Sequence, residues 1–243
     1  MNVFVGTSGY SYPKWKGSFY PAKLPTKQML GYYGTHFRAV EINNTFYRPP
    51  TAAVLDGWAE QVPTGFRFVL KAPQEITHVK RLVNADEMVS SLFATADTLE
   101  ERLGPVLFQL PPNFKKDVPR LRAFLGLLPK DRGAAFEFRN ASWFDDEVFA
   151  LLRLHRVAMC IADADDGLEV PFVSTADRGY LRLRRAAYDD SALRTWAARI
   201  RAERWRDVFV FFKHEDAGTG PRFAKRLLEL LAEGEAVQQK HAG

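Results

Sequence analysis

The chain has a single cysteine, Cys160, among its 243 residues. One cysteine cannot form an internal disulfide, and no cysteine or histidine is spaced around it as a metal ligand. We therefore expect a buried, unreactive thiol in a reducing compartment, the cytoplasm. Apolar runs long enough to cross a bilayer are also missing, and Met1 leads almost directly into an apolar run at residues 3–5, which leaves no room for a signal peptide. The sequence thus predicts a cytoplasmic protein with no membrane partner.

Histidine is also scarce, since the chain has five. Three of them, His36, His155 and His241, lie in or beside expected helices or in the C-terminal tail. A site that needs clustered histidine and carboxylate ligands, such as a multi-zinc nuclease centre, is therefore not expected. A phosphate-loop signature, a linker and a low-complexity tract are missing as well. We expect no metal, and the sequence names no cofactor.

The residues that are present are typical of one globular domain, with 47% hydrophobic and 26% charged side chains. We expect this domain to span residues 1–243, with the polar residues 234–243 as a frayed tail. The net charge of +5 permits binding to phosphates or nucleic acid without requiring it. Arginines are dense between residues 178 and 206, and those at positions 194, 199, 201 and 204 are expected to form the solvated face of one helix.

Strand and helix patterns alternate from end to end. Apolar β-rich runs predict strands at residues 3–6, 38–43, 66–71, 105–110, 134–139, 157–162, 179–184 and 208–213. Helical periodicity predicts helices near residues 26–34, 51–61, 86–102, 118–127, 144–154, 191–203 and 221–232. This order favours an α/β fold, a (β/α)8 barrel of the TIM type. Residues 168–175 resemble an extra strand where a helix is expected, so one helix is missing or distorted between residues 163 and 178.

Most of the expected strands end on a charged or amide residue, where the following loop begins. A parallel strand that is buried on both faces should be apolar along its whole length, so polar ends require a separate reason. In a closed α/β barrel, the active site lies at the carboxyl ends of the strands, and inward-facing residues there converge on one pocket. The residues concerned are Glu41, Asn43, Lys71, Gln109, Glu137, Arg139, Asp163, Arg182 or Arg184, and Lys213 or His214.

Several segments, taken in chain order, resemble the signatures of one known family. They are Gly6–Tyr12 with Trp15, Gly17 and Phe19–Pro21, then Glu41–Pro49, Lys71–His78, Gly104–Pro112 and Glu137–Trp143. Together they cover nearly the whole chain and are similar to the YecE-like family, also named domain of unknown function 72. The resemblance implies a TIM-type barrel, in agreement with the strand count. It implies no established reaction.

The chain departs from this family pattern at two strand ends. Where many members carry Tyr-x-Arg-x-His-Gly on the seventh strand, this chain has Tyr180-Leu-Arg-Leu-Arg-Arg185. The eighth strand, which commonly ends with an asparagine, runs here into Lys213-His-Glu-Asp216. Both changes fall at the expected mouth of the barrel, so they point to a subgroup with a different substrate preference.

Residue types suggest roles within this pocket. Glu41 and Glu137 are candidates for an acid/base pair, and Lys71 is a third catalytic candidate. Side chains expected to bind the ligand are Asn43, Gln109, Arg139, Asp163, Arg184 and Lys213. The alternative is an ion-pair network that closes the barrel without chemistry, but burying so many ionisable groups for structure alone is costly. We favour a functional site, in which Glu137→Gln changes ligand binding and leaves folding nearly intact.

Three of these side chains keep open alternatives. Lys71 can form a Schiff base or act as a base when desolvated, but a nearby glutamate would keep it protonated, which favours an electrostatic role. His78, in the loop after the third strand, is either a ligand-binding acid or base or a cap on a backbone group. His214 with its acidic neighbours is not expected to bind a metal, because adjacent strand residues point to opposite faces.

Aromatic and hydroxyl side chains gather in two loops at the expected mouth. They are Ser8, Tyr10 and Trp15 after the first strand and Tyr47 after the second, where Arg48 follows. Hydroxyls and neighbouring glycines let backbone N–H groups approach an oxyanion, and aromatic rings can stack on a sugar or a base. The same rings can instead plug the barrel beneath a long loop. Two such loops favour a wall on which a ligand stacks.

Two functions follow from these features. The first is a hydrolase, lyase or isomerase that acts on a small polar, anionic ligand such as a phosphorylated sugar or nucleotide. The second is a nucleic-acid-binding protein or nuclease that places rim arginines on phosphates and aromatic rings on an exposed base. A binding scaffold without turnover is a third possibility. The sequence leaves the reaction, the ligand and the oligomeric state open.

Overall fold

Eight parallel strands form a barrel in the computed structural model, which describes residues 1–241, with side chains as far as Glu233. The strands are β1 (Asn2–Thr7), β2 (Ala39–Ile42), β3 (Arg67–Leu70), β4 (Val106–Gln109), β5 (Ala134–Glu137), β6 (Ala158–Asp163), β7 (Arg178–Leu183) and β8 (Asp207–Phe212). Each lies within two residues of the bounds expected from β-rich runs, and the predicted barrel is confirmed.

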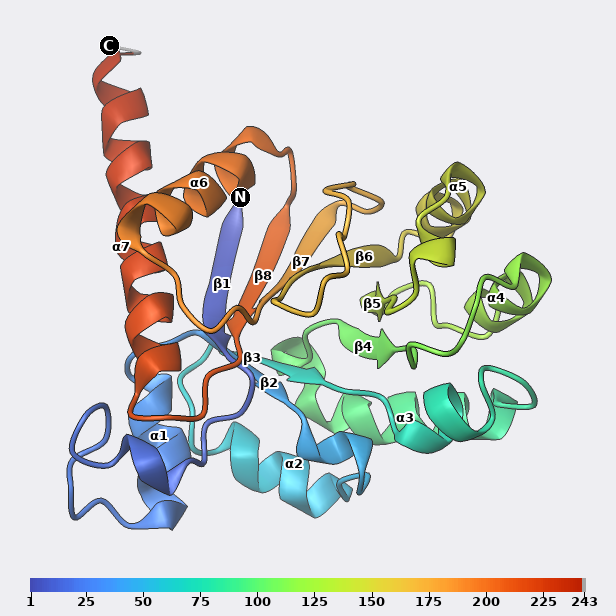
Figure 1. Cartoon of the computed structure of the whole chain (residues 1–243). Coiled ribbons are helices and arrows are strands. Elements are labelled where there is room, and N and C mark those ends of the chain that lie inside the picture. Colours follow the sequence, from blue (N-terminus) through green and yellow to red (C-terminus); the bar gives the residue numbers. More distant parts are fainter. Residues whose placement is uncertain (242–243) are drawn as a thin grey trace.

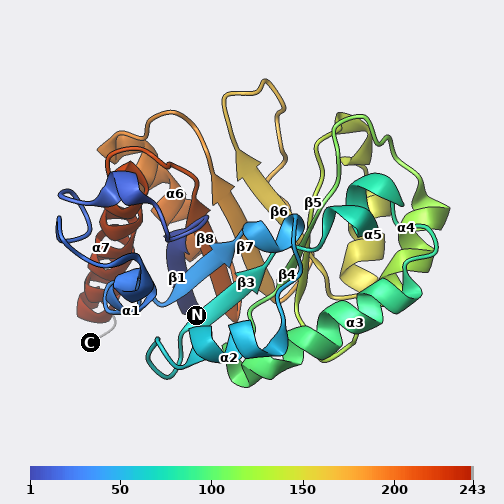
Figure 2. The same ribbon diagram turned by 90° about the horizontal axis from the view of Figure 1, so that it is seen from below.

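The barrel closes at two seams that consist of isolated bridges. Six strands pair in the order β1-β8-β7-β6-β5-β4, and β2 pairs with β3 (Figure 2). The bridge Ser8–Glu41 joins β1 to β2, and the bridge Lys71–Leu107 joins β3 to β4. Two polar strand-end residues, Glu41 and Lys71, therefore lie at the points where the ring is completed.

Seven helices surround the barrel in the described part of the chain (Figure 1). They are α1 (Met29–Gly34), α2 (Ala52–Ala59), α3 (Asp86–Ala96), α4 (Val118–Leu125), α5 (Asp146–Leu154), α6 (Asp190–Ala202) and α7 (Thr219–His241). Four begin at a side chain that accepts a hydrogen bond from a backbone N–H of the first turn, which satisfies a donor that the helix leaves unpaired. These caps are Thr51, Asp117, Asp145 and Asp189.

The C-terminal segment that we expected to form a frayed tail continues α7 as far as His241. Residues 242–243, the end of that expected tail, lie outside the described residues. Within the described residues, no helix combines the length and the apolar character needed to span a membrane.

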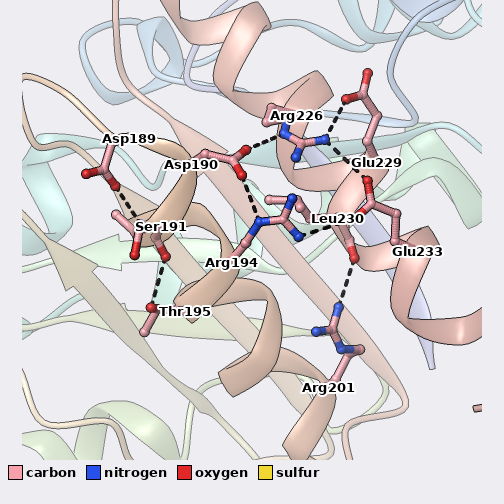
Figure 3. A network of polar contacts seen from close by, with 11 residues as sticks. Asp189, Asp190, Ser191, Arg194, Thr195, Arg201, Arg226, Glu229, Leu230 and Glu233 are labelled. Atoms are coloured by element: carbon pink, nitrogen blue, oxygen red, sulfur yellow. Dashed lines mark hydrogen bonds and ion pairs between the residues drawn. The ribbon is translucent and has the colours of Figure 1, made fainter. Parts of the chain in front are cut away.

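The arginines of α6 contact its neighbours more than we expected of a solvated face (Figure 3). Arg194 bonds Asp190 at 2.7 Å and Glu233 of α7 at 3.4 Å, and Arg201 donates to the carbonyl of Leu230 at 2.9 Å. From α7, Arg226 donates to Asp190 at 2.5 Å. The contacts of Arg194 with Glu233, of Arg201 with Leu230 and of Arg226 with Asp190 join α6 to α7, so both of these α6 arginines take part in contacts between the helices.

No helix follows β6: residues 164–177, all within the described part of the chain, form neither helix nor strand. The missing helix is confirmed, whereas the extra strand suggested for residues 168–175 is wrong. Thr175 explains how this loop is held without a strand ladder. Its buried Oγ1 accepts from the N–H of Met159 and donates to the carbonyl of Val157, both at 2.7 Å. One side chain thus satisfies two backbone groups beside β6.

We predict that Thr175→Val lowers the free energy of unfolding by about 1–3 kcal/mol, because it leaves a buried N–H and a buried carbonyl without partners. The matched control is Thr195→Val on exposed α6, where we expect a change within about 0.5 kcal/mol. Urea denaturation of the wild-type protein and of both variants tests this expectation. Equal losses for both variants would contradict it.

Candidate active site

The inward faces of the strands change from apolar to polar along the barrel axis. Deep in the barrel the inward side chains are small or apolar: Phe4, Ala39, Val69, Leu107, Ala135, Ala158, Cys160, Phe209 and Phe211. Burial raises the pKa of the Cys160 thiol well above its ordinary value, which fits an unreactive cysteine. Two residues further along, the same faces carry the polar strand ends, since strand side chains alternate with period two.

A buried arginine on β7 joins two buried glutamates. Arg182 donates from Nη2 to Glu41 Oε1 at 2.7 Å and from Nη1 to Glu137 Oε2 at 2.5 Å. Both glutamates are 0% exposed and Arg182 is 2% exposed. Burial alone would lower the pKa of Arg182, but Glu137 and Glu41 raise it well above its ordinary value. The three groups therefore form one ion cluster that crosses the barrel.

The other contacts of Glu41 come from β1 and β7. Ser8 donates to Oε1 at 2.7 Å, and the Tyr180 hydroxyl donates to Oε2 at 2.5 Å. Burial and the charge of Glu41 raise the pKa of Tyr180 well above its ordinary value, so the phenol keeps its proton and stays a donor. Ser8 is 1% exposed and holds Glu41 in place, which differs from the ligand contact expected for it.

Glu137 is surrounded by three guanidinium groups. Besides Arg182, Arg139 Nε lies 3.0 Å and Arg184 Nη2 lies 3.4 Å from Oε1. Burial would raise the pKa of Glu137, but Arg182, Arg139 and Arg184 together hold it well below its usual range. Glu137 is therefore ionised near neutral pH and cannot serve there as a proton donor.

Lys71, at the end of β3, makes no ion pair or hydrogen bond through its amine with any described residue. Its Nζ lies 3.7 Å from the centre of the Phe46 ring, and the residue is 9% exposed. Burial lowers the pKa of Lys71 to about 8; Arg182 adds to this effect, while Glu137 and Glu41 oppose it. Both glutamates favour the protonated amine, as we expected, and with a pKa of about 8 most of Lys71 keeps its proton near neutral pH. The glutamate oxygens themselves are occupied by arginine, serine and tyrosine donors.

Further unpaired donors face the same mouth. Gln109 is 5% exposed, and its Nε2 has no hydrogen-bond partner of normal geometry, although the amide lies near Glu137 and helps to lower the pKa of that carboxyl. The Nε of Arg184 is buried and also without a partner among the described residues. Both groups lose solvation without gaining a protein acceptor, which is a cost that a bound ligand can remove.

His78 lies in a short π-helical turn, Glu75–Val79, beside Lys71. Its ring contacts the Phe46 ring edge to face, with centroids 4.9 Å apart, and its Nδ1 lies 2.8 Å from Thr77 Oγ1. Burial, Lys71 and Arg139 lower the pKa of His78, so its imidazole is neutral near neutral pH. Single π-helical turns are frequent at functional sites because they re-aim a side chain.

The aromatic residues after β1 pack mainly against one another and form a plug, whereas we expected a wall on which a ligand stacks. Trp15 is 0% exposed and packs against Tyr12, Phe19 and Tyr20, so it cannot contact a ligand. Tyr10 differs, because it lines a hollow of about 260 Å³ between the loops after β1 and β2. Asn43, which accepts from Arg182 at 3.5 Å, lines the same hollow and connects it to the ion cluster.

Other expected site residues lie at the rim or outside the barrel. Tyr47 is 73% exposed, and Arg48 and Lys213 are also exposed, so these three lie on the outer rim. Asp163 does not join the pocket as we expected. On β6 the inward residues are Ala158, Cys160 and Ala162, so Asp163 points outward, where it accepts from Arg185 at 2.7 Å and from Trp196 of α6 at 3.2 Å.

Sequence reasoning undervalued two central residues. Arg182 appeared only as an alternative to Arg184, and Tyr180 was not selected. Period-two alternation along β7 places Tyr180, Arg182 and Arg184 on one inward face, so that signal was present. Phe46, whose ring supports Lys71, had no comparable signal because it lies in a loop.

A second, larger groove lies away from this chemistry. It has a volume of about 390 Å³ between the loop after β2 and helix α3, and its lining includes Pro49, Pro50, Leu70, Met88 and Leu92. Leu70 faces outward from the barrel, since its neighbours Val69 and Lys71 face inward. Among the described side chains, no group of three or more histidine, cysteine or acidic residues is arranged to hold a metal ion.

Comparison with known proteins agrees with the resemblance seen in the motifs. A family model described as "Protein of unknown function DUF72" matches residues 4–242. The chain is 32% identical over 143 residues to the UPF0759 protein YecE of Escherichia coli K12, which covers 58% of this chain and 50% of that protein. It is 26% identical to the UPF0759 protein YunF of Bacillus subtilis, with 94% of each chain covered. The match thus spans half the length of YecE and nearly all of YunF.

Solved structures share the fold. A crystal structure of a DUF72 family protein (TM1631) from Thermotoga maritima is 28% identical, with a TM-score of 0.83 over 96% of this chain and 100% of that chain. A DUF72 family protein (EF0366) from Enterococcus faecalis is 18% identical, with a TM-score of 0.79 over 95% of each chain. These likenesses extend over the whole barrel.

The ion cluster changes our expectation for Glu137→Gln. Removing its charge leaves Arg182 buried with one carboxylate fewer, so we predict that the free energy of unfolding falls by about 3–5 kcal/mol at about pH 7. Chemical denaturation measures this loss, with the exposed Glu60→Gln as a control that should change stability by less than about 0.5 kcal/mol.

The free energies of unfolding of the wild-type protein and of Glu137→Gln should converge in acid. Because the pKa of Glu137 is depressed in the folded state, its contribution is complete above its unfolded pKa of about 4.3 and is lost as the pH falls through the folded value. The stability difference between wild type and Glu137→Gln should therefore shrink as the solution is acidified. A difference that stays constant down to the lowest pH at which the protein folds would exclude this assignment.

Proposed function

This chain belongs to the DUF72 family. We propose that it is an enzyme of the lyase or isomerase class, which acts on a small anionic ligand at the mouth of the barrel. The observation that carries the proposal is Lys71, a nearly buried amine without a carboxylate partner, set among unpaired donors. An amine in this state is costly as pure structure, because burial disfavours its charge and the nearby Glu137 and Glu41 compensate only in part. We therefore infer that the Lys71 amine takes part in the chemistry of the site.

The charge balance at the mouth favours an anionic ligand. Arg139 and Arg184 share the single charge of Glu137 with Arg182, so positive charge is in excess beside Lys71. Their side chains are 32% and 14% exposed, which lets a ligand reach them. Guanidinium groups bind carboxylate and phosphate oxygens through paired N–H donors. The hollow near Tyr10 and Asn43 adjoins these groups only through the contact between Asn43 and Arg182.

The glutamates have a different role from the acid/base pair that we expected. Both side-chain oxygens of Glu41 and of Glu137 accept hydrogen bonds from neighbouring groups. Hydrolysis by two carboxyl groups requires one of them to be protonated near neutral pH, and Glu137 is held ionised. We therefore favour a lyase or isomerase over a hydrolase. The glutamates position Arg182 and its neighbours.

The nucleic-acid hypothesis has less support from the same contacts. Trp15 is buried, and Arg194 and Arg201 are occupied by contacts between α6 and α7. Tyr47 and Arg48 remain exposed at the rim. A cytoplasmic location remains part of the proposal, and Cys160, the single cysteine, is buried and free.

We predict that small phosphorylated sugars or carboxylates raise the melting temperature of the wild-type protein. Arg184→Gln and Arg139→Gln should each weaken binding by roughly 10- to 100-fold, because each removes a charge-assisted hydrogen bond of about 1.5–3 kcal/mol. Thermal melts and calorimetric titration with glucose 6-phosphate, dihydroxyacetone phosphate and pyruvate make the measurement.

Arg122→Gln on the exposed face of α4 is the control and should bind as wild type. Salt-dependent binding of mixed single- and double-stranded oligonucleotides, together with no response to the small anions, would support the nucleic-acid hypothesis instead.

A further inference from the structure

We infer that Lys71 is a covalent nucleophile that forms a Schiff base with a small aldehyde or ketone carrying a carboxylate or phosphate. This inference rests on the proposed function and specifies its substrate class. An amine that can lose its proton, a fixed position for its nitrogen, and donors for the carbonyl and the anion are the three requirements of such a reaction. Each has a counterpart in the residues around Lys71.

The first requirement is an amine that can lose its proton. A carboxylate partner favours the charged form of a lysine, and Lys71 has no such partner within ion-pair distance among the described residues. Lys71 lies near Glu41 and Glu137, yet Arg182 and the other donors occupy both carboxylates. With a pKa of about 8, Lys71 has roughly two-hundred-fold more neutral amine at about pH 7 than an ordinary lysine of pKa about 10.4.

The second requirement is a fixed position for the attacking nitrogen. The Phe46 ring lies against Lys71 Nζ at 3.7 Å. Thr45, the residue before Phe46, donates from its Oγ1 to the carbonyl of Lys71 at 2.7 Å and to the carbonyl of Ile42 at 2.9 Å. The turn that carries the ring is thus tied to the backbone of the same lysine. This arrangement limits the directions in which the amine can point.

The third requirement is a set of donors for the carbonyl and for the anion. Gln109 lies on β4, next to β3, and faces inward like Lys71; its unpaired Nε2 can donate to a carbonyl oxygen. The unpaired Nε of Arg184 and the partly exposed Arg139 can bind a carboxylate or phosphate on the same molecule. A carbonyl compound with one acidic group would satisfy donors that the protein leaves without acceptors.

The reaction balances without an added oxidant or metal. The lone pair of Lys71 Nζ attacks the carbonyl carbon, a C–N bond forms, and the carbonyl oxygen gains a proton while the nitrogen loses one, which gives a carbinolamine. The hydroxyl then takes up a second proton, which comes from solvent, the C–O bond breaks, water leaves, and the protonated imine remains on Lys71. His78 packs edge to face against the same Phe46 ring and is neutral near neutral pH, so we assign to it the transfer of the proton from the nitrogen to the carbonyl oxygen.

Borohydride trapping tests the covalent step. Wild-type protein is incubated with pyruvate, glyoxylate or dihydroxyacetone phosphate, reduced with sodium borohydride, digested and analysed by mass spectrometry. We expect one reduced adduct, on Lys71, that needs both the carbonyl compound and the reductant. Its rate of formation should rise with pH and level off above about pH 8, because only the neutral amine attacks.

Two variants separate site chemistry from general lysine reactivity. Lys71→Met should fold, since it replaces a desolvated amine by an apolar chain of similar length, and should give no adduct. Lys213→Met removes the exposed lysine at the same mouth and should leave the Lys71 adduct unchanged. Equal labelling of Lys71 and of exposed lysines would overturn the inference.

The outcome also distinguishes the inference from the proposed function. If these anions stabilise both the wild type and Lys71→Met but no adduct is trapped on Lys71, the covalent step is wrong while the anion-binding site stands. If none of the compounds raises the melting temperature or binds in calorimetry, and no adduct forms, both the covalent step and the proposed function are wrong.

Discussion

The polar end of the barrel depends on Arg182, which lies between two glutamates from opposite sides of the ring. Glu41 belongs to β2, Glu137 to β5 and Arg182 to β7, so one side chain connects strands that do not pair with one another. Buried carboxylates are stable only where charge and hydrogen bonds compensate for lost hydration. Arg182 supplies the charge that compensates Glu41, and together with Arg139 and Arg184 it compensates Glu137.

Lys71 is unpaired because of that cluster. Glu41, Glu137 and Asp166, which lies 3.7 Å from Arg184, face Arg139, Arg182, Arg184 and Lys71, so positive groups outnumber negative ones. A lysine can release its proton, whereas an arginine keeps it. Burial is the main cause of the lowered pKa of Lys71, and the charge of Arg182 adds to it. The excess of positive charge also favours a bound anion.

The residues around the cluster combine rigid and adjustable parts. Ser8 and Tyr180 fix Glu41 from two strands, and the bridge between Ser8 and Glu41 is also a seam of the barrel. Around them, Tyr47, Arg48 and Lys213 lie exposed on the rim. Among the departures of this chain from the family pattern, Arg184 belongs to the ion cluster, where it contacts Glu137, whereas Lys213 lies on the exposed rim.

The sequence by itself determined the barrel and the face on which its chemistry lies. Apolar runs at regular spacing identified all eight strands, and polar strand ends identified Glu41, Lys71, Gln109 and Glu137, because period-two alternation is a local property of each strand. Tertiary structure alone decided which charges meet. Asp163 and Trp15 show where prediction from sequence fails. The inward face of β6 is offset by one residue from the position we assumed, so Asp163 points outward. The burial of Trp15 depends on loop contacts that no strand pattern indicates. Whether Lys71 keeps its proton depends on its burial and on which side chains bond the glutamates, and three-dimensional packing sets both.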